Sequence, residues 1–494
     1  MHLPPFRFRL LTFFTLVLAG LSPLLAAAGY SKTNVLFLMT DDYRAELASY
    51  GSQAKTPNLD RLAQRSVQFN RMYAQQAVCN PSRSSLLTGR RPDTLRVWSN
   101  SNHFRDQNPD VPTLPGWFKK NGYTSRCVGK IFHNWHTAVQ GDPTSWSTPE
   151  FLHYANHGDD HPTSPPAQPG ALMKSTRRYG NGPLCEALDV PDETYFDGRV
   201  AQEAVRVLHE IKDAPFFLAV GFWKPHAPFN APKKYWNLYQ RRQFESFNGR
   251  RPEGAPEIAF HASTEILGKN ADASKVALEE AAELRHGYFA NISFLDAQIG
   301  KVLDALDSEG LAERTVIVLI SDHGYHLGEH TLWGKTSNFE LDTRVPCFLS
   351  VPGGPNRGTQ TQSLAELIDL FPTLTALCRL PTPAGLEGQN LEPALLNPTI
   401  QLRAGAFSQH PRPAYFDREP SKQPLAMGVS VRTPTLRYTE WRHWKTGETL
   451  ARELYDALQD PAETRNQADS PAFSAELTNA AALLQKQFPP TPHP

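Results

Sequence analysis

Two nearly continuous apolar runs of strand length each end directly in acidic residues. Residues 34–39 read NVLFLM and continue into TDD, and residues 315–320 read TVIVLI and continue into SDHG. Strands that are apolar on both sides are typical of a parallel sheet covered by helices on both faces. Because ligands bind outside the carboxyl ends of such strands, we expect the acidic residues to meet at one edge of the sheet.

Similar runs alternate with helix-like segments along most of the 494 residues. This alternation predicts the α/β class, with a large, mixed, mostly parallel sheet sandwiched by helices. Further strands are expected at 124–128, 216–221 and 347–351, and helices at 57–65, 114–121, 194–211, 276–306 and 365–377. Two polar inserts, 137–190 and 240–272, are predicted to be surface loops.

The pattern changes after about residue 395. Alternating apolar positions around a turn at 433–435 predict a hairpin, and residues 471–487 predict an amphipathic helix. We therefore expect a catalytic domain at 29–395 and a smaller C-terminal subdomain at 396–494, built from an antiparallel sheet plus a helix.

The N-terminus predicts export. Residues 1–28 carry two arginines, an apolar run and a small-residue cleavage site, which together are typical of a signal peptide; a membrane anchor is the alternative. No later run is apolar enough to span a bilayer, so we expect no stable membrane insertion and a periplasmic or extracellular rather than lysosomal location. Lys+Arg and Asp+Glu both number 50, so the chain has no net positive charge that would favour binding to nucleic acid.

The acidic strand ends predict a metal site. Asp41, Asp42 and Asp322 would bring three carboxylates together, with the imidazole of His323 beside them. Like charges this close need a cation, and oxygen ligands favour Ca²⁺ or Mg²⁺. The alternative for each pair alone is that it caps a turn.

Cys79 opens the stretch CNPSRSSLLTGR, which has a proline near its start and a glycine near its end. This pattern predicts a helix with Cys79 at the positive end of its dipole and Arg83 one turn on. The other four cysteines are sparse, and their pairing is left open. Cys127, Cys347 and Cys378 are predicted to be small buried hydrophobic residues.

Lysine and histidine follow three more strand-like segments or turns. Lys130 and His133 lie in GKIFH, His226 lies in WKPHAP, and Lys335 follows the SDHG turn. Lysine suits a tetrahedral oxyanion, and histidine exchanges protons near neutral pH.

These stretches resemble the sulfatase family of the alkaline-phosphatase superfamily, and within it most closely the iduronate-2-sulfatase group. CNPSRSSLLTGR is similar to the Cys-x-Pro-Ser-Arg signature of the family, and the resemblance extends from NVLFLMTDD to LYDALQDPAET. It implies an alkaline-phosphatase-like fold.

The resemblance also implies how the site works. A formylglycine-generating or other sulfatase-maturing enzyme would oxidise Cys79 to Cα-formylglycine, whose hydrate attacks sulfur. One Ca²⁺ would be held by Asp41, Asp42, residue 79, Asp322 and His323. Arg83 would stabilise the nucleophile, and Lys130 and Lys335 would stabilise the sulfuryl oxygens. His226 and His133 would transfer protons.

Three positions depart from the common family pattern. Lys130 and His133 are three residues apart, a spacing shared with the iduronate-2-sulfatase group, where many sulfatases have two. His323 stands where other sulfatases often have Asn, and Tyr325 stands in place of an expected tryptophan. Asn102, His103 and Tyr325 are predicted to line the substrate pocket.

The sequence therefore predicts a Ca²⁺-dependent formylglycine sulfatase that acts on a sulfated carbohydrate, with 2-O-sulfated iduronate or another uronate of a glycosaminoglycan as the leading substrate. A sulfatase for another glycan, or a phosphatase or phosphodiesterase of the same superfamily, is the alternative. A glycan-binding protein without turnover is a third interpretation, to which the complete set of site residues gives no support.

Overall fold

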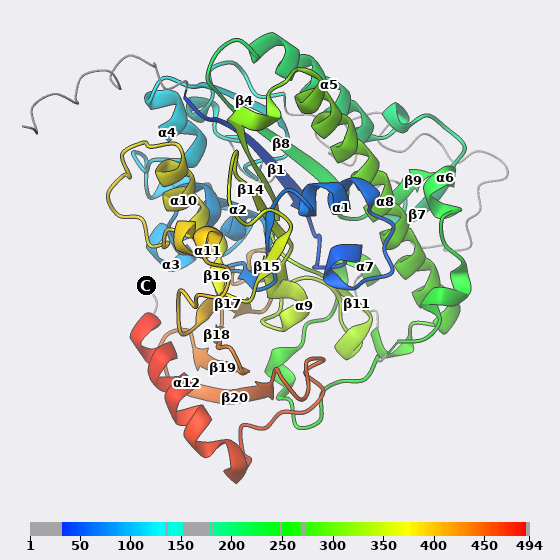
Figure 1. Cartoon of the computed structure of the whole chain (residues 1–494). Helices are drawn as coiled ribbons and strands as arrows, with labels where there is room; N and C mark the ends of the chain where they lie inside the picture. The colour runs from blue at the N-terminus through cyan, green and yellow to red at the C-terminus, as the bar shows by residue number, and fades with distance from the viewer. Residues whose placement is uncertain are drawn as a thin grey trace, which may run out of the picture. The chain divides into compact units, whose positions relative to one another are not determined.

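Seven strands among the described residues form the central sheet (Figure 1). The computed structural model describes residues 32–133, 137, 139–151, 178–179, 182–247, 249–268 and 273–490, so the predicted signal peptide at 1–28 lies outside the described residues. The strands are β1 (Asn34–Asp41), β2 (Val67–Phe69), β4 (Thr124–Gly129), β8 (Phe216–Pro225), β10 (Thr315–Ser321), β14 (Cys347–Ser350) and β15 (Thr359–Thr361).

The strand order is β15-β2-β14-β10-β1-β8-β4. β1 pairs in parallel with β10 and β8, β8 with β4, and β15 with β2, whereas β14 is antiparallel to both neighbours. The predicted large, mixed, mostly parallel sheet is confirmed.

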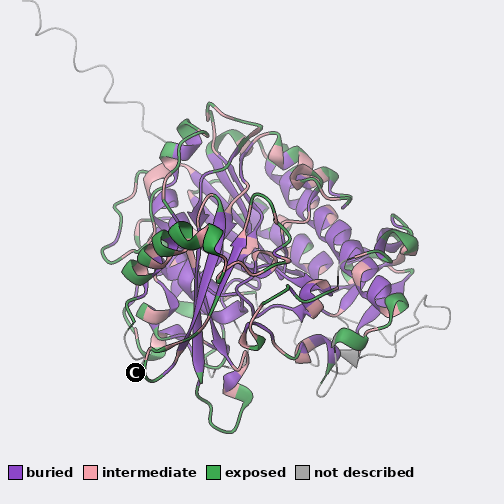
Figure 2. Ribbon diagram, turned by 90° about the horizontal axis from the view of Figure 1, so that it is seen from below, coloured by how far each residue is buried: buried purple, intermediate pink, exposed green. Residues whose placement is uncertain are grey.

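Both faces of this sheet are covered, as the apolar strands predict. Along β1, Val35 and Phe37 point into one apolar cluster, while Leu36 and Leu38 point into the other. Successive side chains of a strand point to opposite faces, so an apolar run with no polar gaps fits only a sheet buried on both sides (Figure 2). The helices that flank it are α1 (Pro57–Ala63), α5 (Phe196–Ile211) and α8 (Leu278–Ser308) on one face, and α2 (Cys79–Thr88), α4 (Leu114–Lys120) and α10 (Leu370–Leu377) on the other.

Two predictions about segments are wrong in part. The helix expected at 365–377 begins only at Leu370, because the Asp369 carboxylate accepts the backbone N–H of Glu366 (2.7 Å) and so caps a preceding turn. The insert 240–272 is not simply a surface loop, since its described part buries Phe244 and Phe260 and contains the short helix α7 (Thr264–Leu267).

The C-terminal part forms a second, antiparallel sheet. The hairpin expected around residues 433–435 joins β18 to β19, and α12 packs on the sheet through Ala480 and Leu484. The elements are β17 (Ala406–Arg412), β18 (Ala426–Arg432), β19 (Leu436–His443), β20 (Thr449–Asp456) and α12 (Ser474–Gln487). The domain boundary at 395/396 stays a prediction.

All five cysteines lie in the described residues, and all five are buried and unpaired. Burial of Cys127, Cys347 and Cys378 agrees with their predicted packing role. Over the part of the chain that the structure describes, no helix is both long enough and apolar enough to cross a bilayer.

Candidate active site

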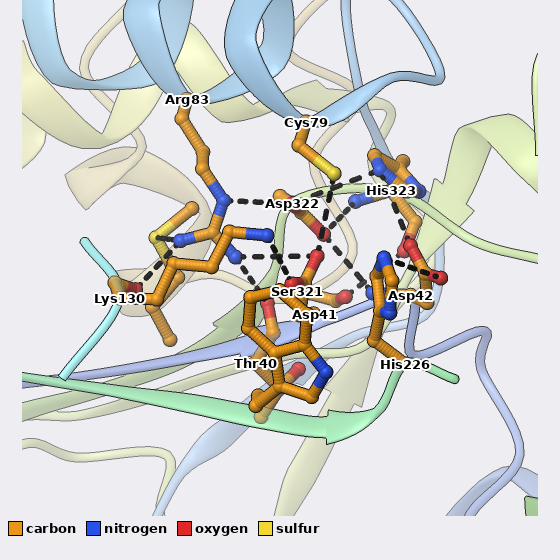
Figure 3. A network of polar contacts seen from close by, with 12 residues as sticks. Thr40, Asp41, Asp42, Cys79, Arg83, Lys130, His226, Ser321, Asp322 and His323 are labelled. Atoms are coloured by element: carbon orange, nitrogen blue, oxygen red, sulfur yellow. Dashed lines mark hydrogen bonds and ion pairs between the residues drawn. The ribbon is translucent and has the colours of Figure 1, made fainter. Parts of the chain in front are cut away.

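The carboxyl ends of four neighbouring strands meet at one edge of the central sheet. Thr40 of β1 is in register with Ser321 of β10, Asp41 is in register with Pro225 of β8, and Gly129 of β4 with Gly221 of β8. This register brings the residues that follow each strand together, as the sequence predicted (Figure 3).

Cys79 is the first residue of α2 and faces these strand ends. The helix follows an extended Val78 and ends at Gly89, whose positive φ of 67° terminates it in the left-handed conformation. The thiol Sγ lies 3.5 Å from Asp41 Oδ1, and Cys79 is 2% exposed. The positive end of the helix dipole therefore points toward a buried carboxylate.

Arg83, one turn further along α2, connects three of the strand ends. Its Nε donates to Asp322 Oδ2 at 2.8 Å, and Nη1 donates to the carbonyls of Lys130 (2.7 Å) and Ile131 (3.0 Å). Nη2 donates to the carbonyl of Thr40 at 3.3 Å. The guanidinium thus fixes the helix start relative to β1, β4 and β10.

Asp41, the last residue of β1, and Asp42, which follows it, are each paired with a buried lysine. Lys130 Nζ donates to Asp41 Oδ2, and Lys335 Nζ lies 2.9 and 3.1 Å from the two carboxylate oxygens of Asp42. Both lysine side chains are only 2% exposed. Two ammonium groups therefore lie near the Cys79 thiol, in a site that is almost inaccessible to water.

Two histidines complete the cluster. His323 Nδ1–H donates to the carbonyl of Gly324 (3.0 Å), which leaves Nε2 facing Asp42 at 3.5 Å and Asp322 at 3.6 Å. His226 Nδ1–H likewise donates to the carbonyl of Ala227 (2.6 Å), and its Nε2 is 3.7 Å from Asp42 Oδ2. A carbonyl oxygen can only accept, so the geometry fixes which ring nitrogen faces the site in both residues.

Burial and charge separate the pKa values of these groups. Burial raises the pKa of Asp41, but Lys130 and Arg83 outweigh it and hold the pKa well below its usual range. Burial, together with Asp41, raises the pKa of Asp42 well above its usual range despite Lys335. Burial and Asp41 also raise the pKa of the Cys79 thiol to about 12, so an unmodified thiol here stays protonated and unreactive at neutral pH.

The residues present fit a hard divalent cation. Asp41, Asp322, His323 and Cys79 bring one donor atom each within 4.8 Å of one another, and Asp41, Asp42, Cys79 and His226 do the same. Among the residues that the structure describes, none hydrogen-bonds His323 Nε2, although this atom is buried. Buried carboxylates, one of them with a raised pKa, and an imidazole nitrogen without a hydrogen bond are the features that a bound cation would satisfy.

The other predicted site residues lie around this cluster. His133, 4% exposed, lies two residues after Ile131, whose carbonyl accepts a hydrogen bond from Arg83. The backbone carbonyl of Asn102 accepts from the side chain of Asn80, the residue after Cys79 (2.6 Å). This places Asn102 near the start of α2.

His103 and Tyr325 are held by protein contacts. The ring of His103 accepts from the backbone N–H of Arg105 (3.2 Å) and donates to the carbonyl of Gly141 (2.9 Å). Tyr325 is fully buried and stacks on Tyr288 with ring centroids 5.6 Å apart. Direct contact of either side chain with a ligand stays a prediction, and for Tyr325 it requires the ring to become exposed.

Sequence reasoning missed Glu265. Its carboxylate Oε1 lies 3.1 Å from Lys335 Nζ and 3.4 Å from His226 Nε2, while Tyr415 donates to Oε2 at 2.5 Å. Glu265 belongs to an insert without strong periodicity, and Tyr415 belongs to the C-terminal part. No local pattern marks either residue, because only the folded chain brings them to the site.

Comparison with known families agrees with this geometry. The model described as Sulfatase matches residues 33–379, and the one described as N-sulphoglucosamine sulphohydrolase, C-terminal, matches residues 328–487. The chain belongs to the sulfatase family and is a sulfuric ester hydrolase.

Among its relatives are two iduronate 2-sulfatases. The Mus musculus enzyme is 36% identical, covering 89% of this chain and 92% of its own, and the Homo sapiens enzyme is 34% identical, covering 88% and 90%. In fold, the chain is similar to the phosphonate monoester hydrolase of Agrobacterium radiobacter, with a TM-score of 0.74 at 24% identity, covering 92% of this chain and 95% of that one.

Proposed function

We propose that this sulfatase removes sulfate from a carbohydrate, with 2-O-sulfated iduronate or another uronate of a glycosaminoglycan as the leading substrate. The observation that carries the proposal is the buried position of Cys79 at the start of α2, between three carboxylates and two lysines. The similarity to two iduronate 2-sulfatases supports the choice of sugar.

The nucleophile in this proposal is a hydroxyl of hydrated Cα-formylglycine, produced from Cys79 by a sulfatase-maturing enzyme. Burial and Asp41 raise the pKa of the Cys79 thiol, which agrees with conversion rather than with direct use of the cysteine. The Arg83 guanidinium, fixed by Asp322 and three backbone carbonyls, orients the helix turn that carries residue 79.

Binding of the sulfuryl group falls to the two buried lysines. Lys130 donates to Asp41 and Lys335 donates to Asp42, and both ammonium groups lie near the thiol of Cys79. Ammonium groups held in a site from which water is excluded stabilise charge that develops on sulfuryl oxygens more strongly than they would in water.

Two histidines move the protons. His226 Nε2 faces the site, so we assign the doubly protonated form of His226 the donation of a proton from Nε2 to the departing sugar oxygen. Burial and Lys335 lower the pKa of His226, so this form requires the negative charge of the bound sulfate ester. His133 is assigned the acceptance of a proton from the second hydroxyl at residue 79, the step that releases sulfate.

Asp41, Asp42, Asp322 and His323 would hold Ca²⁺, together with an oxygen at residue 79. When bound, the cation neutralises the carboxylates and favours ionisation of an adjacent hydroxyl. We further propose export through the signal peptide at 1–28, with a location in the periplasm or outside the cell.

A phosphatase, phosphodiesterase or phosphonate hydrolase activity is the second candidate, favoured by the similarity in fold to a phosphonate monoester hydrolase. It predicts release of phosphate or alkylphosphonate under conditions that leave sulfate esters intact.

The test is sulfate release from heparin or dermatan oligosaccharides that carry a terminal 2-O-sulfated iduronate. Protein in which the mass of the Cys79 peptide shows conversion to formylglycine is compared with the Cys79→Ala variant. Release by the converted protein alone, abolished by chelation of calcium, supports the proposal. No release from these oligosaccharides, with release from other sulfated glycans, would reject the iduronate assignment.

A further inference from the structure

Glu265 places a carboxylate beside both Lys335, which we assign to the sulfuryl group, and His226, which we assign to the leaving oxygen. Oε1 lies 3.1 Å from Lys335 Nζ and 3.4 Å from His226 Nε2. A fourth carboxylate beside a binding site for an anion opposes binding, so its presence calls for a function that offsets this cost.

The carboxylate is held in one orientation by another part of the chain. Tyr415, in the connection between β17 and β18, donates its hydroxyl to Glu265 Oε2 at 2.5 Å. Because Oε2 has this partner, Oε1 is the oxygen presented to Lys335 and His226.

Exposure places Glu265 on the solvent side of the cluster. Cys79 is 2% exposed, and the side chains of Lys335 and His226 are 2% and 4% exposed, whereas that of Glu265 is 11% exposed. A sulfate ester bound with its sulfur against residue 79 must direct its alcohol toward solvent. Because we assign protonation of the leaving oxygen to His226, whose Nε2 is 3.4 Å from Glu265 Oε1, the alcohol lies beside Glu265 as well.

We propose that Glu265 is a specificity-determining residue whose Oε1 accepts a hydrogen bond from the sugar hydroxyl on the carbon next to the sulfated one. The inference rests on the proposed function and deepens it by defining the leaving group as one half of a vicinal diol. The two oxygens of a gauche vicinal diol lie about one hydrogen-bond length apart. When one oxygen of the diol is bonded to His226, the other oxygen therefore lies within hydrogen-bonding reach of the Glu265 carboxylate, which is beside the same imidazole.

The chemistry of a carboxylate supports a hydroxyl as its partner. An ionised carboxylate only accepts hydrogen bonds, so it fits a hydroxyl and repels a second sulfate or a carboxylate at that position. A site built to bond a substrate hydroxyl discriminates strongly against an analogue without it, because the protein group then stays unpaired.

The experiment compares two substrates that differ by one hydroxyl: a methyl uronoside 2-sulfate and its 3-deoxy analogue. With formylglycine-converted wild-type protein, loss of the hydroxyl lowers kcat/KM by about 10- to 100-fold, the range for a hydrogen bond to a charged group. In Glu265→Ala this preference falls to within about threefold, and in Glu265→Gln, which keeps an acceptor oxygen, an intermediate preference remains.

4-Nitrophenyl sulfate, which has no neighbouring hydroxyl, is the matched control substrate. The change in its kcat/KM in Glu265→Ala measures the effect of the substitution on Lys335 and His226, and the loss of the hydroxyl preference is judged against that change. Tyr415→Phe, which removes the Tyr415 hydrogen bond to Oε2, weakens the hydroxyl preference less than Glu265→Ala does. If Glu265→Ala keeps the full preference, or loses activity equally on all three substrates, Glu265 is only a charge partner of Lys335 and the inference is overturned.

Binding separates this inference from the proposed function. Calorimetry with Cys79→Ser protein measures the affinity for the same two sugar sulfates without turnover, with and without Glu265→Ala. A preference for the hydroxylated sugar that disappears with Glu265→Ala supports the inference even if the converted enzyme releases no sulfate, a result that would reject the proposed function alone. If Cys79→Ser protein that keeps Glu265 binds the two sugars with equal affinity, the inference is overturned.

Discussion

Arg83 Nε donates to Asp322 Oδ2 at 2.8 Å, and neither side chain is exposed to solvent. The pair joins the first turn of α2 to the end of β10 across 239 residues of sequence. Because the same guanidinium also bonds the carbonyls of Lys130 and Ile131, it fixes three elements of the site at once.

Replacing Arg83 with Met therefore removes one partner of a buried ion pair. We expect the free energy of unfolding to fall by about 3–5 kcal/mol, since Asp322 is left with less compensation for its burial. Urea denaturation measures the change. Arg61→Met is the control, because the Arg61–Asp304 pair is largely exposed (46% and 62%) and its loss leaves the unfolding midpoint close to that of wild type. Equal midpoints for the two variants would contradict the structural role of Arg83.

Removing one carboxylate from the proposed metal site weakens cation binding. Asp42→Asn keeps the size of the side chain but removes its charge, and we expect the affinity for Ca²⁺ to fall by about tenfold or more. Calcium content after gel filtration and the Tm difference between calcium and chelator both measure it. Asp304→Asn, on an exposed side chain, serves as the matched control and keeps the Ca²⁺ response of the wild type. A wild-type protein whose Tm does not respond to Ca²⁺ would argue against the metal site.

The role of His226 as proton donor predicts a dependence on the leaving group. His226→Ala lowers kcat on a sugar sulfate by about 10²–10⁴-fold, because an alkoxide leaves poorly without a proton. The loss is much smaller on 4-nitrophenyl sulfate, whose phenolate leaves unaided. Equal losses on the two substrates would point to a purely structural role. His209→Ala, at an exposed position, leaves both rates unchanged.

Glu150 gives a pH dependence of stability that does not involve the metal site. Burial raises its pKa from 4.5 to about 7, even though Trp146 Nε1–H donates to the carboxyl at 2.6 Å. The folded state then binds the proton more tightly than the unfolded state. The resulting stabilisation is fully present below pH 4.5 and is lost as the pH rises through 7.

We expect this effect to be about 3 kcal/mol between pH 4.5 and pH 7.5. The measurement compares the unfolding free energies of wild type and Glu150→Gln across this range. The variant, which cannot titrate at this position, becomes more stable relative to wild type as the pH rises. Parallel pH profiles for the two proteins would show that the pKa of Glu150 is not raised.

The central sheet was predictable from the sequence because its signal is local. A run such as that of β1 is apolar at successive positions, which only burial on both faces explains, and its strand bounds differ from the expected ones mainly in a short extension into the acidic residues. The chemistry at the strand ends was predictable for the same reason, since Asp41 and Asp322 come shortly after the apolar runs of their strands in the sequence.

Tertiary structure alone decided which groups meet. Register between β1 and β10 sets the position of Asp42 relative to Asp322, and burial then raises the pKa of Asp42 and of the Cys79 thiol. Glu265 and Tyr415 come from segments 150 residues apart with no periodic pattern, so their contact follows only from the packing of the C-terminal part against the catalytic site. The sequence determined the chemical groups available to this protein, whereas packing decided their distances, their exposure and hence their ionisation, because electrostatic interactions depend on separation and on the exclusion of water.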